Sequence, residues 1–322
     1  MKTRIVEGEA GIAEAAALLA AGEVVALPTE TVYGLGGDAL DAEAAARIFE
    51  AKARPFFDPL IVHLPHLDWL DRLTTAAGDP VVRELISRFW PGPLTLVLPR
   101  REIVPDIVTA GLPTVAVRMS AHSVFRAVLE QFGRPVAAPS ANRFGRISPT
   151  SAADVLEELG GRIPLILDGG PCTVGLESTV VAPSEGALRV LRSGPVTAEE
   201  LAAFGPLLPA GPGIDGPGQM PSHYAPATPM QVLASIAEAD VWDGPGEVGL
   251  LAWSRAERPV RFAAMEVLTP RNDSREAASR LFAAMRRLDS LRLDLILAEP
   301  PPAIGLGEAI LDRLRKAEGP HP

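Results

Sequence analysis

The chain has 322 residues, 47% hydrophobic and 22% charged, which is the composition of an ordinary globular protein long enough for two domains. Its 30 basic and 40 acidic residues give a net charge of -10, which argues against a broad surface for nucleic acid or anionic membranes, because both need a basic face. The single cysteine excludes an internal disulfide and a cysteine-rich zinc site and favours a reducing cytoplasm, and no run of eighteen apolar residues predicts a membrane span.

Short apolar runs alternate with amphipathic segments over the first two hundred residues. Strands are predicted at residues 24–27, 59–64, 93–98, 114–119, 135–138, 164–167, 178–182 and 188–192. Helices are predicted at residues 11–21, 41–52, 80–89, 121–132, 150–159 and 197–203. Asp41 is the expected N-cap of the second helix, and Gly22 and Gly160 are expected helix stops. The pattern predicts an α/β domain with a mixed sheet over residues 1–204.

The composition changes at residues 205–229, where 25 residues contain five glycines and seven prolines. This density excludes a helix or a central strand, so residues 205–228 are predicted to be a linker or a draped loop. Strands are then predicted at residues 229–233, 247–252 and 293–298, and helices at residues 274–290 and 307–317. Asp273 and Glu276 have the spacing of a capping box. Residues 229–322 are therefore predicted to form a small α/β domain.

The glycines of the motif Gly34-x-Gly36-x-x-Ala39 precede a predicted helix and raise the alternative of a dinucleotide site. In such a site the glycines directly follow the strand, so that the pyrophosphate meets the helix N-terminus. Here six residues separate Leu27 from Gly34. We therefore expect a glycine turn and no nicotinamide or flavin site.

The residues just before these glycines are polar. Thr29, Glu30 and Thr31 can hydrogen-bond a polar ligand, and Tyr33 can close one side of a pocket. An ordinary capped turn explains the same residues, because Thr and Gly favour turns. The pattern alone does not decide between a pocket wall and a turn.

Two cations end the second predicted helix. Lys52 is one of only three lysines among the 30 basic residues, and Arg54 follows it. The helix dipole alone favours cations at this position. Asp58 and the proline after it are expected to end this helical segment. The predicted strand that follows places His63 among apolar neighbours. A histidine in such a position is more often a core residue with its hydrogen bonds satisfied than a ligand.

Further polar residues lie at strand ends. Arg118 is on an otherwise apolar strand, where a guanidinium must find an anion. Segment 136–152 contains the hydroxyls and cations typical of phosphate recognition, namely Ser140, Asn142, Arg143, Arg146 and Ser148. A solvent loop with a helix cap at Ser148 or Thr150 is the alternative.

The later predicted strands begin or end with the polar residues Ser178, Thr179 and Arg192. Together the residues predict a pocket for a small polyanion, without a catalytic triad, a metal cluster or a covalent nucleophile.

Seven stretches in order resemble one known family: "PTETVYGLG", "KARPFFDPLIVH", "FWPGPLTLVL", "VAVRM", "APSANRFGRISPT", "GLESTVV" and "LRSGP". With "GPGQMPSHYAPATP" and the residues after it, essentially the whole chain is similar to the two-domain form of the YrdC-domain family, the threonylcarbamoyl-AMP synthases. The resemblance implies a twisted, mixed α/β sheet with a concave, positively charged cavity, and a smaller Rossmann-like α/β domain at the C-terminal side.

The resemblance also implies a reaction. Members of this family are nucleotidyltransferases that combine L-threonine, bicarbonate and ATP into threonylcarbamoyl-AMP and pyrophosphate, with Mg²⁺ expected on the nucleotide. The implied partners are these small molecules and the downstream tRNA threonylcarbamoyl-transferase proteins, with no membrane and no stable tRNA binding. A non-catalytic RNA-binding module of the same fold is the alternative, which the net charge disfavours. A carbamoyl-transferring hydrogenase-maturation protein contains a similar domain but adds zinc-binding cysteine motifs, which one cysteine excludes.

The resemblance assigns roles residue by residue. L-Threonine binding is implied for Thr31, His63, Arg118, Ser178 and the backbone near Ala138. ATP binding is implied for Arg54, Asp58, Thr114, Ser140, Ser148, Arg192 and Tyr224. Lys52 and Arg54 are the implied catalytic residues near the phosphates. Asp58 stands where the family most often has Asn, and its charge leaves three roles open: a contact with ATP, orientation of Arg54 or Lys52, or a contact with magnesium.

The linker carries His223 and Tyr224 in the sequence "SHYAP". A plain spacer gains nothing from an aromatic pair between prolines, and prolines reduce the entropy that a segment loses when it docks. We therefore expect the linker to fold back over the cavity of the first domain, with Tyr224 in contact with the nucleotide.

Overall fold

The computed structural model describes residues 2–184, 186–211, 216–217, 223–255, 257 and 259–318. The chain forms two compact units. The first comprises Met1–Phe144, Pro149–Thr173 and Glu177–Gln219, and the second comprises Gly145–Ser148, Val174–Leu176 and Met220–Pro322. The predicted domain limits at residues 204 and 229 stay a prediction, and residues 212–215 and 218–222 of the predicted linker lie outside the described residues.

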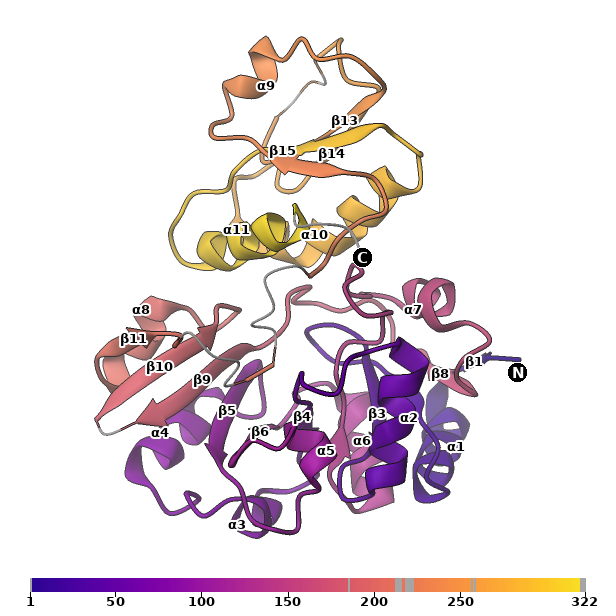
Figure 1. Cartoon of the computed structure of the whole chain (residues 1–322), viewed down its shortest axis with the longest axis vertical. Coiled ribbons are helices and arrows are strands. Elements are labelled where there is room, and N and C mark those ends of the chain that lie inside the picture. The colour runs from indigo at the N-terminus through magenta and orange to yellow at the C-terminus, as the bar shows by residue number, and fades with distance from the viewer. Residues whose placement is uncertain are drawn as a thin grey trace. The chain divides into compact units, whose positions relative to one another are not determined.

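An eleven-stranded mixed sheet forms the first unit (Figure 1). From one edge to the other its order is β1 (Arg4–Val6), β8 (Leu165–Leu167), β2 (Val25–Leu27), β3 (Gly34–Asp38), β7 (Val136–Ala137), β4 (Ile61–His63), β6 (Thr114–Arg118), β5 (Leu94–Pro99), β9 (Thr179–Ser184), β10 (Ala187–Arg192) and β11 (Leu207–Pro209). All eight strands predicted for this part of the chain are present, and β1, β3 and β11 were not predicted. The mixed α/β fold class is confirmed.

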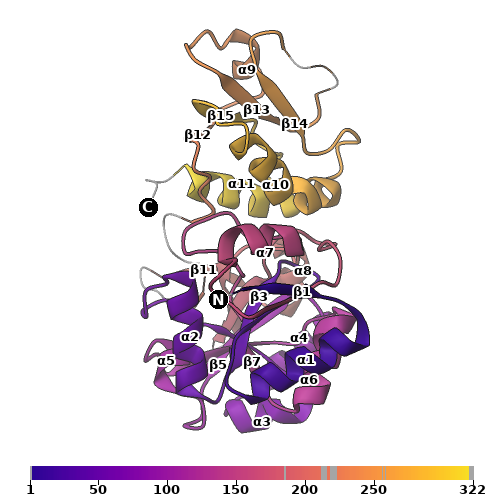
Figure 2. The ribbon, with the colours of Figure 1, turned by 90° about the vertical axis from the view of Figure 1, so that its right-hand side faces the viewer.

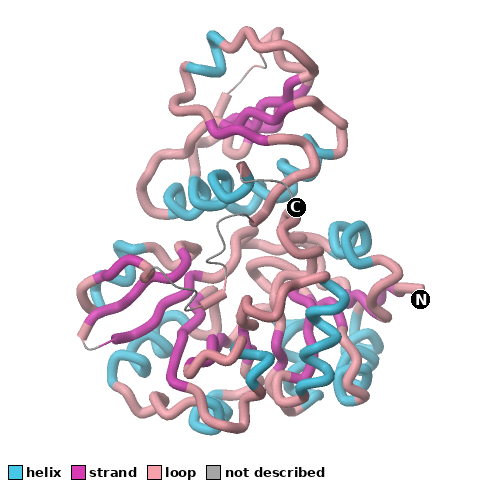
Figure 3. Tube along the Cα trace, in the orientation of Figure 1, coloured by secondary structure: helices cyan, strands magenta, loops and turns pink. Residues whose placement is uncertain are grey.

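The helices of the first unit surround this sheet (Figure 3). They are α1 (Gly8–Ala20), α2 (Ala42–Lys52), α3 (Leu70–Leu73), α4 (Pro80–Phe89), α5 (Asp106–Thr109), α6 (Ser123–Phe132), α7 (Ala152–Leu159) and α8 (Ala198–Leu201), with 3-10 turns at Leu67–Trp69 and Ala202–Phe204. The predicted cap of α2 is confirmed, because the Asp41 carboxylate accepts hydrogen bonds from two backbone amides of the first turn at 2.8 and 3.3 Å.

Strand alternation divides the core of the first unit between the two faces of the sheet. On β2, Val25 and Leu27 pack into a cluster with α1 and α6, which lie side by side in Figure 2. Ala26, between them, packs into the larger cluster on the opposite face, which includes α2 and α4. Successive side chains of a strand point to opposite faces, so a strand that is apolar at every position is buried on both sides.

The glycine motif is a strand and not a turn. Residues 34–38 form β3, which pairs antiparallel with both β2 and β7. A Cβ atom at Gly36 would lie 2.9 Å from Val136 Cγ1 and 3.1 Å from Leu27 Cδ1. The glycines are therefore needed for close packing inside the sheet, and the expected glycine turn was wrong. A buried central strand also leaves no glycine loop for a dinucleotide.

The second unit contains a four-stranded parallel sheet in the order β12 (Met230–Val232), β15 (Leu295–Ala298), β13 (Val248–Ala252), β14 (Ala264–Val267). Helices α10 (Ser274–Asp289) and α11 (Leu306–Ala317) lie side by side along this sheet, and α9 (Glu238–Val241) is a single turn (Figures 1 and 2). The three predicted strands and both predicted helices are present; β14 and α9 were not predicted.

The cap of α10 differs in part from the prediction. Asp273 accepts hydrogen bonds from the amides of Arg275 and Glu276, as expected for an N-cap. The Glu276 carboxylate instead accepts a hydrogen bond from the Thr269 hydroxyl at 2.9 Å. In the described part of the chain, no helix combines the length and the apolar character needed to cross a membrane.

Candidate active site

Arg118, the last residue of β6, is the centre of a buried polar network in the first unit. Its side chain donates three hydrogen bonds: Nε to Gly92 O at 3.1 Å, Nη1 to Thr31 Oγ1 at 3.0 Å, and Nη2 to Glu30 Oε1 at 2.6 Å. Only 3% of Arg118 is exposed. The anion that a buried guanidinium requires is thus Glu30, from a segment 88 residues away in the sequence.

Glu30 is an ionised carboxylate inside the protein. Burial alone would raise its pKa, but the charge of Arg118 and the hydrogen bonds from Ser120 and Arg118 lower it to about 2. The Ser120 hydroxyl donates to Oε2 while Arg118 donates to Oε1, so both carboxylate oxygens have partners. The pair is therefore a fixed, charge-balanced element at physiological pH.

The threonines on either side of Glu30 have different tasks. Thr29 Oγ1 accepts hydrogen bonds from the amides of Thr31 and Val32 and donates to Val32 O at 2.7 Å, so Thr29 forms the ordinary capped turn. Thr31 Oγ1 lies 2.8 Å from Thr29 Oγ1 and accepts from Arg118. Thr29 thus fits the turn interpretation, whereas Thr31 belongs to the network of Arg118 and its place in a pocket wall stays a prediction.

Tyr33 does not close a pocket, which corrects the sequence expectation. Its side chain is fully buried, and its hydroxyl donates to Gly170 O at 2.8 Å and lies 3.1 Å from Asp168 Oδ1. Burial raises the pKa of this phenol further above its ordinary value. Tyr33 therefore fixes the loop after β8.

His63 lies beside Arg118 because β4 and β6 are parallel neighbours in which these two residues are partners in register. The imidazole is 2% exposed and packs on the Phe125 ring, with ring centres 4.8 Å apart. Among the described residues, Nδ1 of His63 has no hydrogen-bond partner. A buried polar atom without a partner costs free energy, and a polar ligand can supply the missing hydrogen bond.

The same surroundings keep His63 neutral. Burial, and then the positive charge of Arg118, lower its pKa to about 3, against smaller raising effects of Glu30 and of a hydrogen bond to the Ala138 backbone. The side chain can therefore hydrogen-bond a ligand at neutral pH without carrying charge.

Ser178 and Arg192 form a second buried pair. Arg192, the last residue of β10, donates from Nε to Ser178 O at 3.0 Å and from Nη2 to Ser178 Oγ at 3.1 Å. Ser178 Oγ also lies 2.7 Å from Thr95 Oγ1. The structure thus brings together a residue predicted to bind threonine and one predicted to bind ATP.

Lys52, the last residue of α2, points toward backbone oxygens. Its Nζ donates to Ser140 O and Asn142 O, and the side chain is 1% exposed. Burial, followed by the nearby charge of Arg54, holds the pKa of this amine well below its usual range. In this conformation Lys52 fixes the loop that follows β7, so it acts on the loop that contains Ser140.

Arg54 and Asp58 form a buried ion pair in the loop between α2 and β4. Arg54 Nη2 lies 2.8 Å from Asp58 Oδ2, and the same guanidinium donates to the backbone oxygens of Asp58 and Pro59 at 3.0 to 3.3 Å. Asp58 Oδ1 is buried and has no partner among the described residues. Of the three roles left open for Asp58, orientation of Arg54 is the one that these contacts support.

The other predicted residues are distributed over both units. Thr114 begins β6 and is half-buried. Ala138 follows β7, and its amide donates to Ile61 O at 2.9 Å. Ser140 is half-buried and forms an isolated antiparallel bridge with Gly34. Ser148 is buried and belongs to the second unit.

Tyr224 also belongs to the second unit. It is 1% exposed and has a left-handed backbone with φ of 67°. Its ring stacks on Phe282 with centres 5.5 Å apart, contacts the His223 ring, and has the Arg313 guanidinium 5.3 Å from its centre. The predicted contact of Tyr224 with ATP stays a prediction.

Sequence reasoning overlooked three residues of these networks, Ser120, Thr95 and Gly92, and it missed that Glu30 is the partner of Arg118. Thr95 gave a usable signal, because it is the one hydroxyl in the apolar run "PLTLVL" and is fully buried. Gly92 acts through its carbonyl oxygen, which side-chain patterns do not reveal. The described residues contain no group of three or more His, Cys, Asp or Glu side chains that could bind a metal ion.

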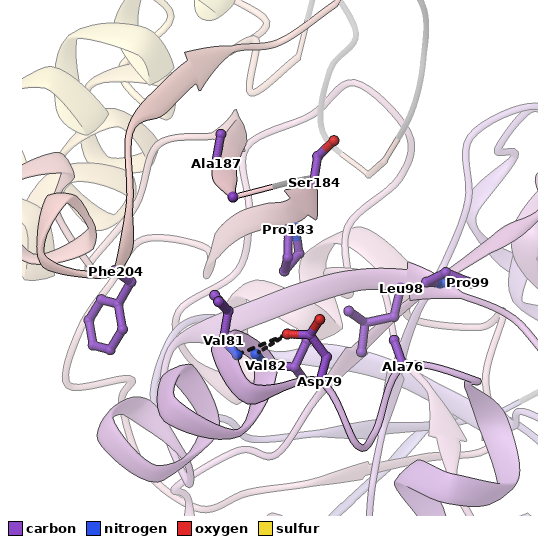
Figure 4. Close-up of a pocket in the computed structure, with 11 residues that line it drawn as sticks. Ala76, Asp79, Val81, Val82, Leu98, Pro99, Pro183, Ser184, Ala187 and Phe204 are labelled. Atoms are coloured by element: carbon purple, nitrogen blue, oxygen red, sulfur yellow. Dashed lines mark hydrogen bonds between the residues drawn. The ribbon is translucent and has the colours of Figure 1, made fainter.

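A pocket of about 210 Å³ lies elsewhere on the first unit, between the start of α4 and the β9–β10 hairpin (Figure 4). It is lined mainly by apolar side chains, and Asp79 at its edge is bonded to backbone amides of α4. None of the residues predicted to bind a ligand lines this pocket, so we do not place the active site there.

More distant solved structures share the fold of the first unit. Escherichia coli YciO superposes with a TM-score of 0.52 at 22% identity, covering 60% of this chain and 96% of that chain. A nucleotide-bound HypF superposes with a TM-score of 0.51 at 21% identity, but only 28% of that chain is covered. These likenesses concern the fold alone.

Nearer relatives match almost the entire chain. A family model described as "Telomere recombination" matches residues 17–194, and one described as "Threonylcarbamoyl-AMP synthase, C-terminal domain" matches residues 196–319. Threonylcarbamoyl-AMP synthases from Pyrococcus abyssi and Bacillus subtilis are 41% and 40% identical over 95% and 96% of this chain, covering 93% of each relative. The structure of P. abyssi Sua5 complexed with L-threonine superposes with a TM-score of 0.88 at 38% identity, covering 99% of this chain and 98% of that chain. The chain belongs to the threonylcarbamoyl-AMP synthase family.

Proposed function

We propose that this chain synthesises threonylcarbamoyl-AMP from L-threonine, bicarbonate and ATP, with release of pyrophosphate. The observation that carries the proposal is the match to synthases from an archaeon and a bacterium at about 40% identity over 95% and 96% of the chain. The buried polar network of Thr31, His63 and Arg118 supports it, because it offers hydrogen bonds to a small polar ligand.

The first chemical step joins two substrates. The amine of threonine and bicarbonate give N-carboxythreonine and water. His63 contributes a neutral buried nitrogen that has no hydrogen-bond partner among the described residues, and Thr31 and Ser178 contribute hydroxyls. We infer that these groups bind the polar atoms of threonine, with Arg118 directed at its carboxylate.

In the second step, the new carboxylate attacks the α-phosphorus of ATP; the bond to the bridging oxygen breaks and pyrophosphate leaves. Two anions must meet, and fixed cations in a water-poor site offset their repulsion better than water does. Arg54 and Arg192 are the cations that we assign to the nucleotide. Holding both substrates in line supplies much of the remaining acceleration, so no protein nucleophile is required.

Mg²⁺ is proposed to arrive on the phosphates of ATP and to neutralise part of their charge. Mg²⁺ prefers oxygen ligands, which the phosphates supply. We further propose that tRNA threonylcarbamoyl-transferase proteins take up the product. The cytoplasmic location and the absence of stable tRNA binding stay predictions, and a filter-binding assay with tRNA tests the second.

A pyrophosphate-release assay with single omissions tests the proposal. Release should require ATP, L-threonine and bicarbonate together, because the attacking group is the carboxylated amine. Release at the full rate without threonine would contradict it.

A further inference from the structure

Two short segments of the N-terminal half of the chain belong to the second unit. Residues 145–148 and 174–176 pack with Met220–Pro322, although the sequence on both sides of each belongs to the first unit. The first segment ends at Ser148, which we assign to ATP. The second ends two residues before Ser178, which we assign to threonine.

The segment 145–148 is held residue by residue. The Ala225 amide donates to Gly145 O at 2.8 Å, and Ala225 forms a parallel bridge with Arg146. The Arg286 guanidinium, from α10, donates through Nη2 to Ile147 O. The three residues before Ser148 thus each contact a residue from the C-terminal part of the second unit, either Ala225 or Arg286 of α10.

The segment 174–176 is held by close packing. Gly175 has a left-handed backbone with φ of 77°, and a Cβ atom there would lie 2.5 Å from both Ala278 O and Ser279 Cα of α10. Side chains essentially never approach a helix backbone so closely, so only glycine fits. Leu176 beside it is fully buried.

One helix therefore contacts both segments. Ala278 and Arg286 are eight residues apart on α10, which is roughly 12 Å along a helix axis. We propose that α10 fixes the two loops in their productive positions, with Arg286 and Gly175 as positioning residues for the nucleotide and threonine sides respectively. This inference rests on the proposed function, and it gives the C-terminal domain a task in substrate binding.

Arg286→Ala tests the nucleotide side, with Arg287→Ala as the matched control. Arg287 occupies the same last turn of α10 but is exposed and pairs with Glu266 at 2.6 Å. Arg286→Ala should raise the KM for ATP at least about fivefold, the size of one lost hydrogen bond, and change the KM for threonine less than about twofold. Arg286→Lys should restore part of the affinity, and Arg287→Ala should behave as wild type.

Gly175→Ala tests the threonine side, with Gly133→Ala as its control. Both glycines have a positive φ, 77° and 74°, but nothing lies within 4 Å of a Cβ atom at Gly133. Both variants carry the same backbone strain. A difference between their KM values therefore measures the effect of the close contact between residue 175 and α10. Gly175→Ala should raise the KM for threonine at least about fivefold above that of Gly133→Ala.

Amide hydrogen exchange on the full chain separates this inference from the proposed function. Arg286→Ala should speed exchange at residues 145–150 relative to Arg287→Ala. If Arg286→Ala matches Arg287→Ala in exchange and in both KM values, α10 does not position the nucleotide loop and the inference is overturned. If wild-type protein releases no pyrophosphate, the proposed function fails, and the exchange comparison still decides whether Arg286 holds the segment.

Discussion

Two buried cations of the first unit, Arg118 and Lys52, are held in opposite ways. Arg118 is paired with the ionised carboxylate of Glu30 at 2.6 Å. Lys52 donates to two neutral backbone oxygens, those of Ser140 and Asn142. The sequence suggested a ligand-binding cation in both cases.

This difference suggests different roles: Arg118 is suited to bind a ligand, and Lys52 is suited to hold a loop in place. A guanidinium whose charge is balanced stays ionised at all physiological pH values and can hold its geometry for a ligand. A lysine bonded to carbonyl oxygens stabilises the loop that carries them, and its low pKa shows how costly its charge is there. Substitutions of the two cations and of their neighbours test this division.

Breaking the Arg118 pair should have the largest effect. Arg118→Ala leaves Glu30 as an unpaired buried anion, and removing one partner of a buried pair typically costs about 3–5 kcal/mol of unfolding free energy. Calorimetry should show a loss of threonine affinity much larger than the loss of ATP affinity. The double variant Glu30→Gln with Arg118→Met should regain part of the stability but not the affinity. Equal losses for both ligands would contradict a threonine-specific role.

Lys52→Ala should follow. We expect it to lose most of the activity, and also to lose about 1–3 kcal/mol of stability, because it removes the donor of two hydrogen bonds to backbone oxygens inside the protein. Because Lys52 is almost completely buried, we do not expect this variant to be as stable as wild type. Urea unfolding and pyrophosphate release measure the two effects. Wild-type stability would show that the loop does not depend on Lys52.

The neutral His63 beside Arg118 makes a pH-dependent contribution. Its pKa is about 3 in the folded protein, against an ordinary value of 6.5. Between these values the unfolded chain binds more protons, so stability should fall as the pH falls from 6.5 toward 3. Glu30, with a pKa of about 2 against 4.5, adds a loss only below pH 4.5.

The change of unfolding free energy between pH 6.5 and 4.5 therefore reflects the histidines and not Glu30. His63→Gln should flatten the fall of unfolding free energy there, measured by urea titration at three pH values. His122, whose pKa is lowered by burial and which is only half-buried, provides the comparison. The contrary result would be a pH dependence of the unfolding free energy that is unchanged in His63→Gln and weaker in His122→Gln. It would show that His122, and not the His63 beside Arg118, causes the loss of stability.

The smallest expected effect concerns a second cation–carboxylate pair. Asp58→Asn removes the charge that balances Arg54 while leaving the backbone contacts of Arg54 in place. We expect a modest loss of stability and a KM for ATP about two- to fivefold lower, because the freed positive charge attracts phosphates. A raised KM would show that the carboxylate of Asp58 supports ATP binding, either through the orientation of Arg54 or by a direct contact.

Much of the fold was predictable because local patterns determine it. The eight expected strands of the first unit are present, since each is a short apolar run between turn residues. Strand β3 was missed because three of its five residues are glycines, which locally indicate a turn. Gly36 is explained by Val136 and Leu27, which come from neighbouring strands, and Gly37 by the close approach of Ala44 and Ile48 of α2.

The candidate site was predictable in its members but not in its pairings. Arg118 visibly required an anion, yet no local pattern could select Glu30, 88 residues away. The position of His63 beside Arg118 depends on the register of two parallel strands. The contacts of Tyr33 and Lys52 with loop oxygens could not be predicted, because these oxygens lie far along the chain. The role of Lys52 near the phosphates stays a prediction. Long-range hydrogen bonds thus carry the information that the sequence pattern lacks.

We propose that one active site joins threonine, bicarbonate and the adenylyl group of ATP. Its most direct test is a double-label experiment, with ¹⁴C-bicarbonate and ³H-threonine incubated with ATP and the purified chain, followed by isolation of the adenylate. We expect one equivalent of each label per AMP in the same product. An adenylate that contains threonine without carbon from bicarbonate, or AMP formation that is independent of threonine, would contradict it.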